Sequence, residues 1–285
     1  MVSKKMIILA RNFRMKYKKR NTGFFGLLTG LIAGFIFIIP LDSSAQTLEV
    51  GAAGGVSYYI GDINPGMPFK QSQLAYGAVA RYNMNKRWTV KFSYTRAKLV
   101  GDDLKSNAVA NRELNFKTNI NDFALVGEFN FWEYFTGSKK NYFTPYIFAG
   151  VGFFTFKPFN FDGVNLQAHG TEGQSQYQDQ QFEGRAPYKL WSISFPFGIG
   201  FKYSLTSRLG LSLEWGMRKT LTDYVDDIST TYYTSNDQVS DPTGSHSAGM
   251  QRGNEANDDW YNCTLLSVTY RFNLYGSRKC KENEW

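Results

Sequence analysis

The chain has 285 residues and a formal net charge of +8, from 32 Lys and Arg against 24 Asp and Glu. Eight of the basic residues and a single acid lie in the first 45 residues, so the rest of the chain carries a charge close to +1. The basic excess therefore gives no support for a nucleic-acid partner. Aromatic residues make up 17% of the chain and only two residues are Cys, which favours many strands over a disulfide scaffold.

Residues 1–45 have the pattern of a secretory signal peptide. A basic stretch precedes an apolar run over residues 24–39, and the small residues Ser43, Ser44 and Ala45 follow. The alternative is an uncleaved anchor, but the apolar run spans only about 24 Å as a helix, less than the roughly 30 Å hydrocarbon core. We expect cleavage before Gln46 and export, with Met1 and Met15 both open as the start of translation.

Eight later segments alternate apolar and polar residues, which is the period of a β-strand between two environments. The fifth segment is apolar on both faces and is the least regular. In the seventh, Leu209, Leu211, Leu213, Trp215 and Met217 occupy every second position. The eight segments are residues 48–60, 74–84, 88–98, 118–133, 145–156, 190–204, 209–220 and 260–274.

The connections between these segments alternate in length. Long ones cover residues 62–73, 101–117, 157–189 and 221–259, and short ones cover residues 85–87, 134–144 and 205–208. Short turns on one side, long loops on the other and an even strand number are the plan of an outer-membrane barrel. We predict an all-β fold, an eight-stranded antiparallel transmembrane barrel of the OmpA-like kind over residues 46–275, with a periplasmic C-terminal tail at 276–285.

A soluble lipocalin-like barrel and a β-sandwich also alternate, but their apolar faces point inward. The segments here exceed the usual strand length of about 5–6 residues, and their polar faces combine Gly and Ser with isolated charges. Eight strands enclose an interior just wide enough for side chains. We therefore expect a plug of paired charges and no open channel, formed by Arg81, Lys91, Glu128, Lys202, Glu214, Arg218 and Arg271.

An acidic segment follows the seventh strand, and the topology places it at the outer rim: Thr222, Asp223, Tyr224, Asp226 and Asp227. Its three carboxylates could supply oxygen ligands to Ca²⁺. Capping of the loop or solvation of the rim is the alternative, and the spacing does not match an EF-hand. We assign no metal and no other cofactor.

Catalysis and disulfide formation have little support. The two histidines, His169 and His246, both lie in long loops, and no GxSxG pattern is present. We expect neither an enzyme nor a small-molecule substrate. Cys263 and Cys280 lie toward opposite ends of the last strand, too far apart for a disulfide within the chain.

The periplasmic side offers two candidate partner-binding elements. Lys139 and Lys140 lie in the turn at residues 133–143, and the tail holds the second group, Arg278, Lys279 and Trp285. Docking to a periplasmic or lipoprotein partner is one interpretation, and a frayed terminus is the other.

Four segments carry a resemblance to a known family: GDINP at 61–65, FPFGIG at 195–200, residues 218–231 and QRGN at 251–254. In these segments the chain resembles PorG-like outer-membrane proteins of the type IX secretion system of Bacteroidetes. The resemblance covers roughly residues 46–275, and its most specific part is the acidic segment with its flanks.

The resemblance implies a non-enzymatic barrel of the cell outer membrane that contacts membrane lipids and anchors a periplasmic, lipoprotein-containing ring of the secretion system. It transfers no functional residues to this sequence. Two alternatives stay open. One is a free-standing OmpA-like barrel for surface adhesion or envelope integrity, and the other is a narrow solute channel.

Overall fold

The computed structural model describes residues 46–66, 68–106, 109, 111–175, 182–234 and 237–273. The expected signal peptide and the tail residues Arg278, Lys279, Cys280 and Trp285 lie outside this part of the chain and stay predictions.

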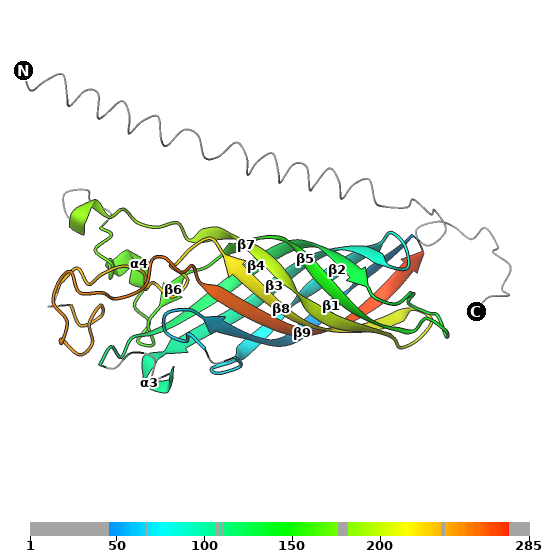
Figure 1. Cartoon of the computed structure of the whole chain (residues 1–285), viewed down its shortest axis with the longest axis horizontal. Helices are drawn as coiled ribbons and strands as arrows, with labels where there is room; N and C mark the ends of the chain where they lie inside the picture. Colours follow the sequence, from blue (N-terminus) through cyan, green and yellow to red (C-terminus); the bar gives the residue numbers. More distant parts are fainter. Residues whose placement is uncertain are drawn as a thin grey trace, which may run out of the picture. The chain divides into compact units, whose positions relative to one another are not determined.

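Eight long strands form the wall of a closed antiparallel barrel (Figure 1). Around the wall, β1 pairs with β2 and β9, and the ladder between β3 and β4 closes the circle. The predicted fold and strand number are confirmed. The strands are β1 (Thr47–Ile60), β2 (Gln73–Asn83), β3 (Trp88–Asp102), β4 (Asn115–Asn130), β5 (Phe143–Thr155), β7 (Trp191–Ser204), β8 (Leu209–Thr220) and β9 (Trp260–Asn273).

Short elements occur in the long loops, which gather at one end of the barrel, at the left in Figure 1. They are α3 (Asp103–Ser106), β6 (Pro158–Phe159), α4 (Leu166–His169) and η2 (Phe182–Gly184). In the described part of the chain, no helix is both long and apolar enough to cross a membrane.

The wall is apolar outside and charged inside. Leu125, Ile199 and Leu213 point outward and are 51%, 52% and 49% exposed, whereas Glu128 and Arg218 point inward and are 0% and 2% exposed. A water-soluble barrel or sandwich buries its apolar face instead. The wall therefore faces lipid, and the two soluble alternatives are wrong.

The largest differences from the predicted strand ends occur in β3 and β4. The ladder between β3 and β4 continues outward to the pair Asp102 and Asn115, beyond the predicted ends at residues 98 and 118. At its inner end, β4 stops at Asn130 and not at residue 133. Phe131 and Trp132 are both exposed there, so the alternation between the two faces is lost.

Glycines of β7 leave room for aromatic rings inside the barrel. A Cβ on Gly200 would lie 2.6 Å from the Tyr146 ring, and one on Gly198 would lie 2.8 Å from the Phe148 ring. Any larger residue would collide with these rings or with the neighbouring backbone. This packing gives the FPFGIG segment a structural role in filling the lumen.

Candidate functional site

The lumen is filled by a network of buried charges centred on Glu128 of β4. Its Oε2 lies 2.6 Å from Lys202 Nζ, and its Oε1 lies 3.2 Å from Lys91 Nζ and 3.3 Å from Arg81 Nε. All four side chains are at most 4% exposed. Three cations from three different strands thus share the negative charge of one carboxylate.

Two further acids continue this network. Glu214 forms an ion pair with Lys91, and Tyr146 Oη donates to its Oε2 over 3.0 Å. Asp122 Oδ2 lies 2.8 Å from Arg218 Nε, in a pair that is at most 2% exposed. The predicted plug of paired charges is present for six of its seven members: Arg81, Lys91, Glu128, Lys202, Glu214 and Arg218.

The prediction is wrong for Arg271, which does not join the plug. Its Nη1 donates to the backbone carbonyl of Thr136, and its guanidinium lies 4.6 Å from the Phe135 ring centroid. Residue 271 is near the inner end of β9, level with the periplasmic turn after β4. The alternating pattern predicted correctly that Arg271 lies on the inward face of β9, but it did not predict the level of Arg271 along the barrel axis.

The long loops fold together into an outer cap, which we define as the described residues of 61–72, 103–114, 156–190 and 221–259. The acidic family segment lies inside this cap: Val225, Asp227 and Ile228 are at most 2% exposed. The segment is on the expected outer side of the barrel, but of the two alternatives to a Ca²⁺ site its burial does not fit solvation of the rim. Burial obliges its carboxylates to find donors within the protein.

Asp226 and Asp259 share a single tyrosine hydroxyl. Tyr59 Oη lies 2.5 Å from Asp226 Oδ2 and 2.6 Å from Asp259 Oδ1. A hydroxyl has one proton and can donate to just one of the two carboxylates. The second short contact requires a proton on a carboxyl group, in agreement with the pKa of each aspartate, which burial raises well above its usual range.

The remaining oxygens of this pair cap the backbone of the acidic segment. The Ile228 amide donates to Asp226 Oδ1 over 2.9 Å, and the Val225 amide donates to Asp259 Oδ2 over 2.8 Å. These contacts are loop capping, which was the alternative to a Ca²⁺ site. In the described part of the chain, no cluster of three or more His, Cys, Asp or Glu could hold a metal ion.

Asp227 and Glu172 meet at Arg252. Arg252 Nη1 lies 2.6 Å from Glu172 Oε1, and its Nη2 lies 3.8 Å from Asp227 Oδ2. Tyr188 Oη donates to Asp227 Oδ1 over 2.5 Å. Burial raises the pKa of Asp227 to about 7, although Arg252 opposes the shift.

The cap holds more acids than bases around the family segment. Burial and the neighbouring Asp226 raise the pKa of Asp223 to about 9. Arg112 binds Asp103 through two contacts of 2.7 Å. Seven acids, at least partly buried, surround three arginines, Arg112, Arg185 and Arg252; the acids are Asp62, Asp103, Glu172, Asp223, Asp226, Asp227 and Asp259.

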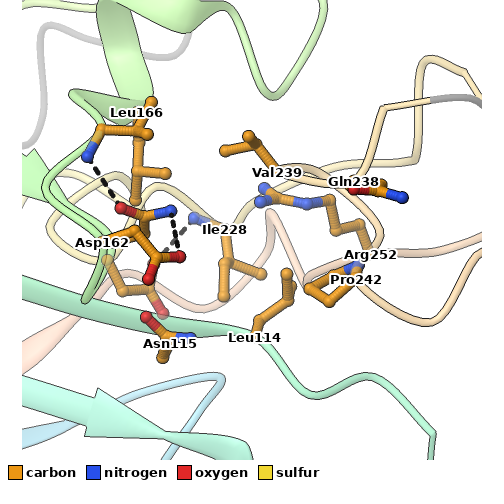
Figure 2. A pocket seen from close by; sticks show the side chains of 12 residues that line it. Leu114, Asn115, Asp162, Leu166, Ile228, Gln238, Val239, Pro242 and Arg252 are labelled. Carbon is orange, nitrogen blue, oxygen red and sulfur yellow. Dashed lines mark hydrogen bonds between the residues drawn. The ribbon is translucent and has the colours of Figure 1, made fainter.

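A cavity of about 420 Å³ opens within the cap (Figure 2). Asp226, Ile228 and Arg252 line it from the family segment and its partner loop, and Leu114 and Val239 add apolar surface. The cavity thus combines one arginine and the carboxyl groups of Asp162 and Asp226 with apolar and amide groups.

Neither histidine is arranged for nucleophilic catalysis. His246 Nδ1 lies 2.9 Å from Asp241 Oδ1 and 3.4 Å from Ser245 Oγ, so the same ring nitrogen faces both groups. A serine relay needs the two ring nitrogens to face them separately. His169 Nε2 contacts Asp237 at 3.0 Å, at a partly exposed position.

Lys139 and Lys140 are exposed at the tip of the periplasmic turn between β4 and β5. The turn below them is fixed by hydrogen bonds: the Gly137 amide donates to Ser204 Oγ over 2.6 Å, and Thr136 Oγ1 donates to Glu49 Oε1 over 2.6 Å. The two ammonium groups therefore project from an anchored loop, away from the ion pairs of the lumen. Whether they bind a partner stays a prediction.

Sequence reasoning missed the cap residues that come from distant loops, above all Glu172 and Arg252. They are 80 positions apart and meet only because two loops fold together over the barrel. The QRGN segment at 251–254 carries Arg252, and its resemblance to a known family was the one available signal.

The family profile described as "Domain of unknown function (DUF6089)" matches residues 29–281. Comparison with functionally curated proteins finds no match.

Solved barrels with a related fold share little sequence with the chain. The N-terminal β-barrel domain of Pseudomonas aeruginosa OprF is 14% identical, over 80% of this chain and 98% of that one, with a TM-score of 0.36. E. coli outer membrane protein W is 13% identical over 81% and 100%, with a TM-score of 0.38. Neisserial surface protein A is 11% identical over 80% and 98%, with a TM-score of 0.38.

The wall of the barrel places the protein in the outer membrane. It is a closed antiparallel barrel of eight strands with an apolar exterior and a charged interior. Closed barrels of this kind satisfy every backbone hydrogen bond within lipid and are the form in which strands cross the outer membrane. The protein is an integral outer-membrane barrel.

Proposed function

We infer that this chain, which belongs to the DUF6089 family, serves as a closed outer-membrane anchor for a protein-secretion assembly. The observation that carries the inference is the filled lumen. Glu128, Lys91 and Lys202 are buried against one another across the interior, at distances of 2.6–3.2 Å. A barrel with this interior suits holding a partner at the membrane better than conducting solutes.

The resemblance to PorG-like proteins supports a narrower proposal. The chain would be an accessory subunit of type IX secretion that binds periplasmic, lipoprotein-containing ring subunits and has no catalytic role. The exposed lysines Lys139 and Lys140 and the C-terminal tail are the proposed contacts, because they lie on the side that faces the periplasm. The outer cap lies on the opposite side of the membrane from such a ring.

Site-specific crosslinking in cells tests this proposal. A photo-reactive residue at position 139 or 140 should crosslink to a periplasmic ring subunit, whereas the same residue at Lys105, which is 63% exposed on the outer cap, should not. A strain that lacks the protein should also fail to secrete type IX substrates. Intact secretion together with no crosslink at 139, 140 or the tail would overturn the proposal.

A free-standing barrel that acts through its outer surface is the second candidate, and the buried outer cap with its cavity of about 420 Å³ favours it. It predicts normal secretion in the deletion strain, with loss of surface adhesion or envelope integrity. Exchanging residues 221–259 for a short turn would then reproduce the deletion, whereas a ring anchor should retain its periplasmic crosslinks.

A further inference from the structure

The outward face of β3, β4 and β5 changes from aromatic to polar residues near its outer end. The pairing register places Tyr94, Phe123 and Phe153 side by side across the three strands. Two residues further out, the next row is Arg96, Asn121 and Thr155. Aromatic residues mark the boundary of the apolar band in such barrels, so the second row lies where hydrocarbon gives way to lipid headgroups.

Basic side chains gather above this boundary. Lys98 is paired with Asn119, and Lys117 is paired with Phe159 of β6. The Phe156 amide bonds to the Leu190 carbonyl, which brings the next residues, Lys157 and Lys189, to the same edge. We define the outer basic patch as Arg96, Lys98, Lys117, Lys157 and Lys189.

No acid neutralises the outer basic patch. Within the described part of the chain, none of its five members forms an ion pair. Arg96 Nη1 donates to Asn121 Oδ1 over 3.1 Å, and Lys117 Nζ donates to the Phe161 carbonyl over 3.0 Å. The patch therefore keeps its positive charge available for a partner.

Two of the lysines lie over aromatic rings of the wall. Lys189 Nζ is 5.0 Å from the Trp191 ring and Lys157 Nζ is 5.4 Å from the Phe159 ring. These contacts hold the ammonium groups against the wall of the barrel, at the edge of the lipid. The acids of the same strands are paired elsewhere: Asp122 and Glu128 face the lumen and are paired there, and Asp102 pairs with Lys105 at 3.5 Å. The nearby acid Asp162 is exposed and contacts Asn160 at 3.5 Å.

We propose that the outer basic patch binds the phosphate groups of an anionic lipid in the outer leaflet. The arrangement supplies five cations on one side of the wall, each within reach of headgroups and none paired with an acid among the residues that the structure describes. Ammonium and guanidinium groups bind phosphate strongly at such an interface. The lipid's acyl chains would lie on the apolar rows directly below, including Phe123 and Phe153, which are 42% and 43% exposed. This proposal does not depend on the secretion role.

Lipid retention by the purified, folded full-length chain tests the proposal. Native mass spectrometry in detergent would compare lipid A, a glycolipid with two phosphates, with neutral phosphatidylcholine. The patch variant carries Lys98→Gln, Lys117→Gln and Lys157→Gln. The matched control removes the same charge from the periplasmic turns, through Lys86→Gln, Lys139→Gln and Lys140→Gln.

The wild type and the control should retain lipid A equally, and the patch variant should retain about tenfold less. Phosphatidylcholine should bind all three proteins alike. Faster gel migration before boiling than after would show that each variant is folded. Equal lipid A retention by the patch variant and the control would overturn the proposal. So would complete displacement of the lipid by millimolar inorganic phosphate, since that would indicate a site for free phosphate.

Discussion

The lumen and the outer cap both bury many charged side chains, but they balance the charge differently. Within the described residues, the plug of the lumen sets four bases against three acids, each of them in an ion pair: Arg81, Lys91, Lys202 and Arg218 against Asp122, Glu128 and Glu214. Around the family segment, the cap sets three arginines against seven acids, with two carboxyl groups around the single hydroxyl of Tyr59. The charges of the lumen plug are held in ion pairs, whereas the cap also needs protons on some of its carboxyl groups.

Because of this difference, we expect the lumen plug to stay closed and the stability of the outer cap to vary with pH. The buried ion pairs of the lumen, which connect several strands, give the barrel a fixed plug. A cap that depends on protonated carboxyl groups changes its stability within the ordinary pH range. We therefore expect substitutions in the lumen to affect the whole barrel and substitutions in the cap to affect the outer loops alone.

The largest expected effect follows from Glu128→Gln. The change removes the charge that three buried cations share and should lower the free energy of unfolding by about 3–5 kcal/mol. Urea unfolding in lipid vesicles measures it. Lys86→Gln is the control, because its pair with Glu133 at 3.2 Å is about half exposed and should contribute no more than about 1 kcal/mol. Equal losses of stability in the two variants would show that the buried network contributes no more than a surface ion pair.

A smaller and local effect should follow from Arg252→Gln. The variant loses the pair with Glu172 and the hydrogen bond to the Asp227 carbonyl, and should lower the free energy of cap opening by about 2–4 kcal/mol. Hydrogen exchange should speed up at amides 225–230 and stay unchanged in the strands. Lys105→Gln, at an exposed position on the same side, should leave both unchanged. Faster exchange in β4 or β9 would show that cap and lumen unfold together.

The pH dependence should sharpen the contrast further. Burial raises the pKa of Asp227 to about 7, and burial with Asp226 raises that of Asp223 to about 9, from a usual value of 3.8. The folded cap therefore binds protons that the open cap releases. This stabilisation is complete below about pH 4, and it is lost as the pH rises through about 7 and then about 9.

Asp237 acts in the opposite direction. Burial raises its pKa, but hydrogen bonds from Ser240, His169 and Tyr233 outweigh burial and lower the value to about 2. Its contribution is present above pH 3.8 and is lost as the pH falls toward 2. Protection of the cap amides against hydrogen exchange should thus be greatest near pH 4–6 and smaller at pH 9. Asp223→Asn should reduce the loss of protection above pH 7. Exchange protection of the cap that increases from pH 5 to pH 9 would contradict this account.

The sequence predicted the barrel well because alternation is a local property that the closed wall imposes on every strand. It also predicted six members of the plug, since the interior of eight strands is narrow and inward charges of opposite sign must meet, but it did not include Asp122, the partner of Arg218. It failed for Arg271, because alternation reports the face of a strand and not the level of a residue relative to its neighbours.

The cap was beyond such reasoning. For the aspartates of 222–231 the sequence left loop capping and solvation of the rim both open, because acids are usually exposed. Their burial depends on Arg252, Glu172 and Tyr188, which loops without periodicity bring from other parts of the chain. The outer basic patch was readable in principle, because Lys98, Lys117 and Arg96 occupy outward positions, but only the register shows that they are neighbours.

Ion conductance across a planar bilayer tests the central claim, that the lumen is closed by its own side chains, most directly. The wild-type protein, shown to be folded by its gel migration, should give no stable conductance steps at neutral pH. Removal of the loops at residues 221–259 should leave it closed, because the ion pairs of Glu128 lie in the barrel and not in the cap. Regular conductance steps from the folded wild-type protein would contradict the account.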